Sequence, residues 1–320
     1  MESSPYIRDH IRSVIIEAPG SIANLGPGFD ILAMAIEGFK DRVKLSITPG
    51  KGQIRIKVKG YEVPENEGNV AYSILKKIIN EYSLWDIDFL VEITKGVPVS
   101  AGLGSSGATS AAVAYGLSVL LGLDLSQREL LKLAGIGEAH VAGAPHYDNV
   151  AASLFGGIVI VDPVELVVHV VKPKVEFWVG IIVPEARLKH SKTKEARSIL
   201  PRVIDLHLHV KQSASLAKLI HALHVGDLVT LGKAISSDYI VEPHRAKLVK
   251  EYWSIKEIAL RDGALGFNIA GAGPSVFLIH RTKTGAIRTC KRIVEYLQST
   301  GTKALFYVTR ISEKGARIIE

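Results

Sequence analysis

The stretch of this chain whose residue types best suit ligand chemistry is PVSAGLGSSGA, residues 98–108. Gly102, Gly104 and Gly107 stand there with two serines, between a strand-like run and a helix-like run. Glycines let backbone N–H groups approach a ligand closely, and amides at the start of a helix attract anions. The stretch predicts a phosphate-binding loop, although a glycine-rich turn that binds nothing has the same composition.

Two common phosphate loops do not fit this stretch. Its three glycines satisfy the G-x-G-x-x-G pattern of dinucleotide-binding folds, but those folds also need a second strand and an acidic residue about 20 positions on. Asp124 has roughly that spacing, yet it follows the expected helix directly and leaves no room for a strand. The P-loop pattern fails because no Lys-Ser or Lys-Thr pair follows the glycines.

The elements around the loop alternate between the periodicities of strands and helices. Residues 43–48 and 53–60 alternate like antiparallel strands, with PGKG as the turn between them. Ser126 and Glu129 form a capping box at the start of a helix. The first half also predicts helices over 69–82, 108–122 and 126–140, and strands over 88–94 and 156–162.

The second half mixes strands and helices without repeating the first. Strands are expected over 175–184 and 303–311, and helices over 213–227, 246–263 and 290–300. His207 and His209 in HLHV are expected on a strand face or in a loop, without metal-ligand spacing. This mixture predicts an α+β layer of helices on a sheet. A soft boundary near residues 160–175 divides the chain into two lobes that pack together.

Composition narrows the functional class. The net charge is +7, but Lys and Arg are scattered rather than gathered with aromatic residues, which argues against nucleic-acid binding and suits an anionic small ligand. Cys290 is the only cysteine, so no disulfide forms within the chain, and a reducing cytoplasmic location fits. The lack of an 18-residue apolar run and of a signal-peptide start argues against membrane insertion and secretion.

Four ordered motifs resemble those of the GHMP kinases, the superfamily that includes galactokinase, homoserine kinase and mevalonate kinase. They are the loop at 98–108, APGSIANLGPGFDILAMAI (18–36), GAPHYDNVAASLFGG (143–157) and NIAGAGPSVF (268–277). The second and third motifs resemble the homoserine kinases in particular. The resemblance implies a bilobal fold, with an α/β domain like ribosomal protein S5 at 1–165 and a ferredoxin-like α+β domain at 166–320.

By this resemblance the cofactors are ATP and Mg²⁺. Ser106 and Glu138 would hold the metal ion, and Asn69 would border the adenine. Read by itself, Glu138 could equally be a solvated helix residue. The residues implied to bind the ATP phosphates are Pro98, Val99, Ser100, Ala101, Gly102, Leu103, Gly104, Ser105, Ser106, Gly107 and Ala108.

The resemblance also implies an amino-acid substrate with a side-chain hydroxyl, L-homoserine. Arg197 and Arg245 would bind its carboxylate, because a guanidinium forks onto both oxygens, and Asp30 would bind its ammonium. Asn24 and His146 would complete the substrate contacts. Without the resemblance, each arginine is equally a surface cation, and Asp30 a charge at a helix N-terminus.

Asn149 matches the position where many relatives place a catalytic aspartate. An amide cannot act as a general base, so we expect direct attack of the hydroxyl on the γ-phosphate, with Asp148 as a rival base. Gly107 stands where these kinases usually have Ala, and Tyr147 where homoserine kinases usually have Pro.

The expected function is therefore that of a homoserine kinase in threonine biosynthesis. The alternatives are a shikimate or mevalonate kinase of the same superfamily, a non-catalytic ligand-binding relative and, more remotely, a dehydrogenase. Shikimate and mevalonate lack the ammonium that Asp30 would bind. A homodimer is expected on base rates.

Overall fold

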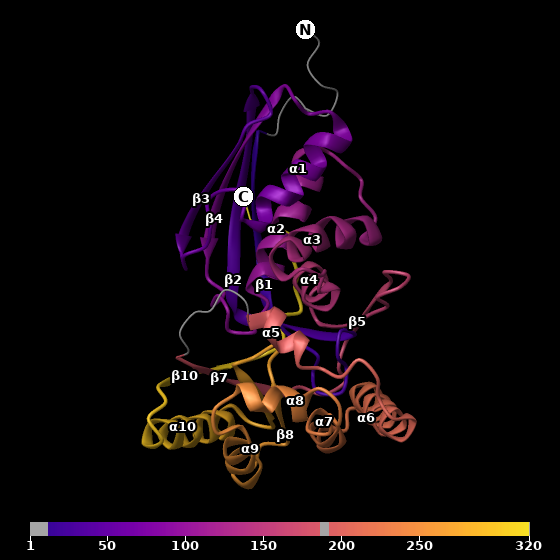
Figure 1. Ribbon diagram of the computed structural model, residues 1–320, viewed down its shortest axis with the longest axis vertical. Coiled ribbons are helices and arrows are strands. Elements are labelled where there is room, and N and C mark those ends of the chain that lie inside the picture. The colour runs from indigo at the N-terminus through magenta and orange to yellow at the C-terminus, as the bar shows by residue number, and fades with distance from the viewer. Residues whose placement is uncertain (1–11, 186–191, 320) are drawn as a thin grey trace.

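The chain folds as two lobes stacked along the long axis of the molecule (Figure 1). The computed structural model describes residues 12–185 and 192–319. Within those ranges, none of the helices is both long and apolar enough to cross a membrane. The α+β class expected from the sequence is confirmed.

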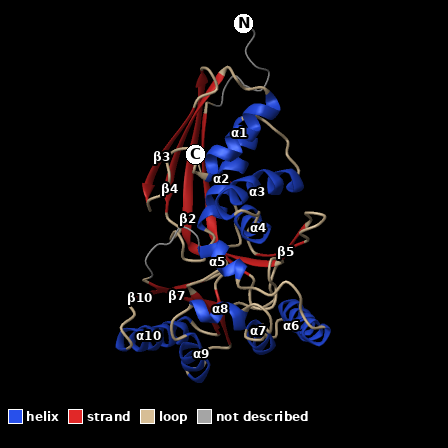
Figure 2. Cartoon of the chain, in the orientation of Figure 1, coloured by secondary structure: helices blue, strands red, loops and turns tan. Residues whose placement is uncertain are grey.

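The upper lobe is built on a seven-stranded sheet with the strand order β11-β1-β2-β4-β3, in which β5 pairs with β2 and β6 pairs with β5. Its helices α1 to α4 cover one face of this sheet (Figure 2). The strands are β1 (Ser13–Ala23), β2 (Leu32–Pro49), β3 (Ile54–Gly60), β4 (Ile87–Lys95), β5 (Ile158–Val161), β6 (Val168–Val171) and β11 (Arg317–Ile318). The helices are α1 (Val70–Tyr82), α2 (Ser105–Leu120), α3 (Gln127–Ala142) and α4 (Tyr147–Phe155).

Helix α2 is the central helix of this lobe and is rich in alanine, serine and glycine. Small side chains allow neighbouring elements to approach closely, and a Cβ at Gly116 would lie 2.6 Å from Leu45 of β2. This close contact packs the second half of α2 directly against β2. The predicted capping box is confirmed at the start of α3, where Ser126 and Glu129 bond reciprocally.

The lower lobe is built on a four-stranded antiparallel sheet with the order β10-β7-β9-β8. Its strands are β7 (Trp178–Pro184), β8 (Gly266–Ile269), β9 (Val276–His280) and β10 (Ala304–Thr309). Its helices are α5 (Lys192–Ser198), α6 (Leu206–Val225), α7 (Leu228–Ile235), α8 (Glu242–Arg245), the 3₁₀ turn η1 (Ala246–Leu248), α9 (Tyr252–Arg261) and α10 (Lys283–Ser299).

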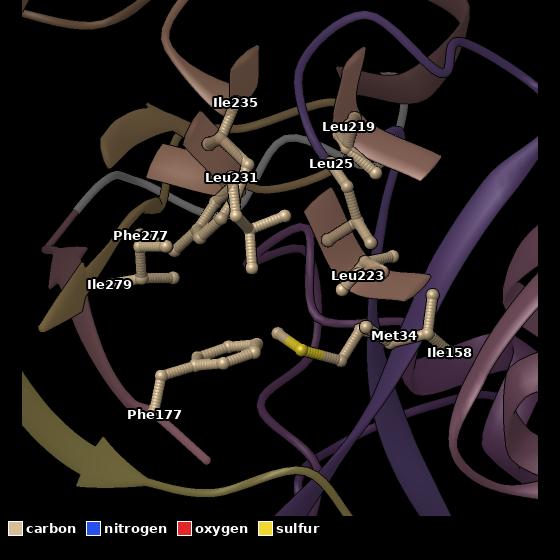
Figure 3. Close-up of a pocket in the computed structure, with 10 residues that line it drawn as sticks. All are labelled: Leu25, Met34, Ile158, Phe177, Leu219, Leu223, Leu231, Ile235, Phe277 and Ile279. Atoms are coloured by element: carbon tan, nitrogen blue, oxygen red, sulfur yellow. The ribbon is translucent and has the colours of Figure 1, made fainter. Parts of the chain in front are cut away.

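Alternation along β9 gives the lower sheet two apolar faces. Val276 and Leu278 belong to a core shared with α9 and α10, whereas Phe277 and Ile279 belong to a core shared with α6, α7 and strands of the upper lobe. The second core joins the two lobes. Figure 3 shows a gap in this core, lined by Met34 and Phe177 among others, with a volume of about 10 Å³, which is too small for a ligand.

One predicted strand pairing is wrong. Residues 43–48 and 53–60 are both strands, but they do not form a hairpin through PGKG. Strand β4 lies between them, pairing antiparallel with β2 and parallel with β3. Alternation reports which face of a strand is buried, whereas the choice of partner depends on packing between distant segments.

Two further expectations need correction. His207 and His209 lie in the first turn of α6, where Asp205 caps the helix, rather than on a strand or in a loop. The expected helix over 246–263 is interrupted, because Val249 is extended and Glu251 is left-handed before α9 begins.

The proposed division at residue 165/166 remains a prediction. After that point, β6 still pairs with β5, and β11 returns to pair with β1 in the upper sheet.

Candidate functional site

A cleft of about 900 Å³ opens between the lobes. Loops from both lobes line it, including the glycine-serine loop, the loop at 271–272 and the segment at 24–30. Sixteen of the residues predicted from sequence line this one cleft: Asn24, Asp30, Asn69, Pro98, Val99, Ser100, Gly102, Gly104, Ser105, Ser106, Glu138, His146, Asp148, Asn149, Arg197 and Arg245. The fold thus brings together residues that are spread over more than 200 positions of the chain.

The other four predicted residues lie in the same loop but do not line the cleft. Ala101, Leu103 and Ala108 are buried in the core between the lobes. Gly107 packs against Asn149, whose Cβ would lie 3.3 Å from a Cβ added at that glycine. These four residues pack against the protein on the side of the loop away from the cleft. Only their backbone atoms could therefore contact a ligand.

Gly102 and Gly104 are required by the shape of the loop. Both have positive φ, 79° and 67°, which side chains other than glycine rarely adopt. A Cβ at Gly102 would lie 2.3 Å from the carbonyl oxygen of Ala270, and one at Gly104 would lie 2.2 Å from Ser21 Oγ. Gly104 gives α2 no side-chain cap, and the first turn of α2 has no acidic residue. Its amides therefore suit a phosphate.

A buried ion pair that the sequence did not reveal holds both ends of this loop. Lys95 donates to Asp41, to the carbonyl oxygen of Ser105 at 2.8 Å and to Thr109 Oγ1 at 2.8 Å. Asp41 also accepts the N–H groups of Gly96 and Val97. Burial lowers the pKa of Lys95, while the adjacent Asp41 opposes that shift. The strand before the loop and the helix after it are thereby tied to one carboxylate.

Glu138, His146 and Asp148 are titratable groups that line the cleft near α3 and α4. His146 Nδ1 lies 3.2 Å from Glu138 Oε2. Burial lowers the pKa of His146, but the hydrogen bond and charge of Glu138, with other nearby carboxylates, outweigh it, so the pKa is raised. Burial, and then the charge of Asp30, raises the pKa of Asp148 to about 7. One oxygen of Asp148 accepts the N–H of Asn149 at 2.8 Å.

Tyr147 fits the site despite its departure from proline. Its ring packs over Gly135 of α3, where an added Cβ would lie 2.5 Å from the ring. This contact sets the first residue of α4 against α3, next to His146 and its partner Glu138.

Glu138 and Ser106 suit a hard divalent cation. Glu138 is 3% exposed, and its Oε1 is buried with no hydrogen-bond partner among the described residues, while the other oxygen faces His146. Ser106 offers a hydroxyl from the first turn of α2. Mg²⁺ takes oxygen ligands and is often held by only one or two protein groups besides phosphates and water. No cluster of three or more His, Cys, Asp or Glu suited to a metal occurs in the described ranges.

The amide of Asn149 has a fixed direction. Ser21 Oγ donates to Asn149 Oδ1 at 2.9 Å. With its oxygen occupied, the amide presents N–H groups as donors to the cleft that it lines. Ser21 was not identified from the sequence, although it stands within the 18–36 motif.

Opposite charges meet at the boundary of the lobes. Arg197 of α5 donates to Asp30 Oδ2 at 2.6 Å. Arg245 is only 4% exposed and donates to the carbonyl oxygens of Gly271 at 2.9 Å and Ala196 at 3.2 Å. Both guanidinium groups lie over the ring of Phe29, another residue that the sequence did not single out. Burial lowers the pKa of Arg245 to about 10, so it stays cationic at neutral pH.

Two predicted asparagines are held by backbone groups. Asn24 donates to the carbonyl oxygen of Gly271 at 3.1 Å and accepts the N–H of Asp30 at 3.2 Å. Asn69 caps α1 by accepting the N–H of Ala71, and it donates to the carbonyl oxygen of Pro64. Both shape the walls of the cleft, and contacts of these side chains with a ligand remain predictions.

Family models match both lobes of the chain. Residues 69–157 match "GHMP kinases N terminal domain", and residues 219–298 match "GHMP kinases C terminal". The homoserine kinase of Methanococcus vannielii is 39% identical over 84% of this chain and 88% of its own length. The homoserine kinase of Thermoplasma volcanium is 32% identical over 92% of this chain and 94% of its own length.

A solved structure of a homoserine kinase has the same overall fold. The crystal structure of homoserine kinase from Cytophaga hutchinsonii superposes with a TM-score of 0.88 at 30% identity, over 97% of this chain and 98% of that chain. The L. major mevalonate kinase reaches a TM-score of 0.70 at 15% identity over 92% and 95% of the two chains, a likeness of fold alone.

Proposed function

The chain belongs to the GHMP kinases, and from that premise we propose that it transfers the γ-phosphate of ATP to the side-chain hydroxyl of L-homoserine. The product is O-phospho-L-homoserine, an intermediate of threonine biosynthesis. The expected two-lobed fold of the family is confirmed. Within the site, the observation that carries the substrate assignment is the grouping of Asp30, Arg197 and Arg245 in the cleft that the glycine-serine loop also lines.

This grouping matches a zwitterionic amino acid. The substrate carboxylate takes the donors of Arg245 and Arg197, and its ammonium takes Asp30. Arg197 and Asp30 bond to each other in this structure, so the guanidinium already faces a carboxylate and Asp30 already faces a cation, the charges that the two ends of the substrate carry. When a substrate without an ammonium draws Arg197 to its carboxylate, it offers Asp30 no cation in place of that arginine.

The glycine-serine loop supplies backbone donors to the phosphates of ATP, and Lys95 and Asp41 keep that loop in place. Ser106 and Glu138 are the residues that would hold Mg²⁺. When bound, this ion neutralises charge on the β- and γ-phosphates. Asn69 stays the proposed neighbour of the adenine.

Phosphoryl transfer needs alignment and charge stabilisation more than covalent help from the protein. The hydroxyl oxygen of homoserine attacks the γ-phosphorus, the bond to the β–γ bridging oxygen breaks, and the hydroxyl proton leaves to the transferred phosphate or to water. Asn149, oriented by Ser21, donates a hydrogen bond at this centre. His146 and Asn24 border the substrate.

Replacement of two adjacent residues tests this mechanism. Asn149→Ala should lower kcat by about 10–100-fold because an aligned donor is lost. Asp148→Asn should lower kcat by less than about tenfold, since the amide keeps the shape and the hydrogen bond to the helix. A loss beyond about 10³-fold for Asp148→Asn, in a protein that is still folded, would instead make Asp148 the general base.

The activity itself is tested by ADP release with Mg²⁺-ATP and a panel of acceptors: L-homoserine, mevalonate, shikimate, galactose and none. We expect turnover with L-homoserine only, and none when Mg²⁺ is chelated. Turnover with another acceptor would overturn the roles of Asp30, Arg197 and Arg245. Binding of ATP without any turnover would instead favour a non-catalytic relative.

The oligomeric state and the cellular location stay predictions. We propose a homodimer in the cytoplasm, and sedimentation of the purified protein tests the first of these.

A further inference from the structure

Arg245 enters the cleft from a helix of four residues, α8, which is too short to be stable by itself. Some other contact must therefore set the direction of its guanidinium group. We propose that Glu242, one turn earlier on α8, is a positioning residue for the carboxylate-binding site, supported by Asp238, Tyr252 and Lys256. This inference rests on the proposed function, because it assumes that Arg245 binds the carboxylate of the substrate.

The start of α8 is fixed by Asp238, which is 6% exposed. Asp238 accepts the N–H groups of Ile240, Val241 and Glu242 at 2.9–3.1 Å. Gln212 of α6 donates to the same carboxylate at 3.0 Å. The buried Asp238 thus pairs the free backbone amides at the start of α8 and links this turn to the long helix α6.

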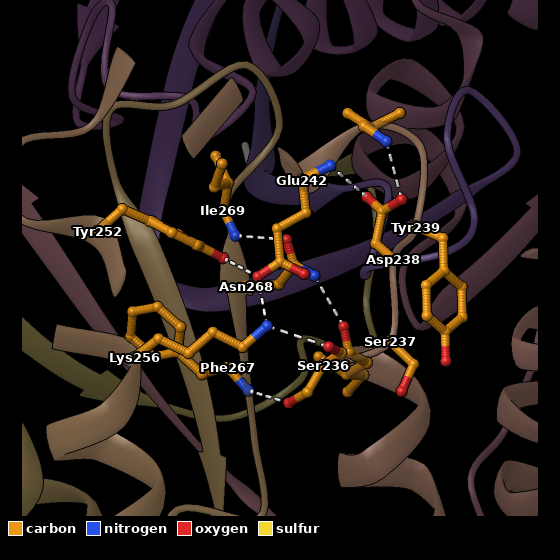
Figure 4. Close-up of polar contacts among 12 residues, drawn as sticks. Ser236, Ser237, Asp238, Tyr239, Glu242, Tyr252, Lys256, Phe267, Asn268 and Ile269 are labelled. Atoms are coloured by element: carbon orange, nitrogen blue, oxygen red, sulfur yellow. Dashed lines mark hydrogen bonds and ion pairs between the residues drawn. The ribbon is translucent and has the colours of Figure 1, made fainter. Parts of the chain in front are cut away.

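Glu242 then anchors α8 to α9 from inside the lobe. It is 2% exposed, and its Oε1 accepts the hydroxyl of Tyr252 at 2.5 Å and the ammonium of Lys256 (Figure 4). Lys256 also donates to the carbonyl oxygen of Ser236 at 3.0 Å, at the end of α7. Neither Glu242 nor any of its three supports lines the cleft, so they lie behind the site rather than in it.

Arg245 stands three residues after Glu242, on the next turn of the chain. Its Nε and Nη1 are committed to the carbonyl oxygens of Ala196 and Gly271. That leaves the Nη2 edge to meet a carboxylate. Because both contacts are to backbone atoms, a small rotation of α8 would break them and turn this edge away from the substrate.

A buried carboxylate of this kind is not explained by stability alone. Replacing a buried ion pair by apolar residues is often neutral or stabilising, because removing two charges from water is costly. The lower lobe also provides a comparison. Asp262 is also a buried carboxylate and accepts from Arg288, Arg292 and Thr289, although both arginines are largely exposed; it does not line the cleft and holds no residue that does.

The test compares Glu242→Gln with Asp262→Asn in the intact protein. We expect Glu242→Gln to raise the KM for L-homoserine by about tenfold, the size of one misaligned charged hydrogen bond, with the KM for ATP unchanged and kcat within about threefold. Asp262→Asn should lower the melting temperature but leave both KM values unchanged. An equal KM for homoserine in Glu242→Gln and wild type would overturn the proposal.

A double-mutant cycle tests whether Glu242 acts through Arg245. Once Arg245→Met has removed the carboxylate contact, adding Glu242→Gln should raise the KM for homoserine no further. A full additional tenfold rise in that background would contradict a positioning role. Should Glu242→Gln not fold, Tyr252→Phe removes one of the two donors, and its KM for homoserine should rise about two- to fourfold; no rise would count against the proposal.

Failure of the proposed function would look different. In that case wild-type protein would not turn over L-homoserine at all, whereas failure of the positioning role would leave an active wild type and an unaltered variant.

Discussion

Asp148 and Asn149 are adjacent in the chain and line the same cleft, but their surroundings give them different chemistry. Asp148 is 2% exposed and lies near Asp30, so its charged form is disfavoured. Asn149 is neutral and is oriented by Ser21. The sequence identified both positions through a contiguous motif. It did not reveal Ser21 as a partner, because the two residues are 128 positions apart.

The raised pKa of Asp148 makes stability depend on pH. Between the usual pKa of 3.8 and the folded value of about 7, the folded chain keeps a proton that the unfolded chain releases. This residue's contribution to the free energy of unfolding therefore falls as pH rises through that range. Asp148→Asn has no charge to bury, so its melting temperature relative to wild type should rise from pH 4.5 to pH 8. A constant difference between the two proteins would contradict the shift.

At the scale of elements, periodicity located most helices and strands because each signal is local. It could not give the partner of β3, since β4 inserts between strands that are neighbours in sequence. Nor could it find the pair of Asp41 and Lys95, which are 54 positions apart. The glycine-serine loop was recognisable because its glycines lie close together in the sequence, but the ion pair of Asp41 and Lys95 behind it was not.

A substitution in that loop tests its packing against Ser21. Gly104→Ala should raise the KM for ATP by about tenfold or more, because the added Cβ would lie 2.2 Å from Ser21 Oγ. Gly38→Ala is the matched control. Gly38 also has positive φ, 82°, but a Cβ there meets nothing within 4 Å. Both variants should lose about 1–2 kcal/mol from backbone strain. Equal KM values for ATP in the two would show that the contact is unimportant.

At the scale of the whole molecule, we expect the apolar core between the lobes to make them unfold as one unit. Leu25 and Met34 from the upper lobe meet Leu223 and Phe277 from the lower lobe. Close-packed interiors transmit strain, so neither lobe can lose this interface without cost to the other. The cleft therefore lies at the edge of a shared core rather than across a loose hinge.

Removing a side chain from the core between the lobes tests whether both lobes unfold together. Leu223→Ala should lower the free energy of unfolding by about 2–5 kcal/mol, and calorimetry should show one transition shifted as a whole. Leu305→Ala, at a side chain that is 55% exposed, should change stability little. Two separate transitions, of which only one moves, would mean that the lobes unfold independently.

The pairing of β11 with β1 has a consequence for how the protein is made. Arg317 of β11 bonds to Glu17 of β1 at 2.6 Å, although 300 positions separate them. Domains usually fold in order as they leave the ribosome. Here Glu17 emerges early and can pair with Lys40 and Arg42 soon afterwards. Its third partner, Arg317, is synthesised only after every strand of the lower lobe's sheet. The half of the chain translated first is therefore the half whose sheet is finished last.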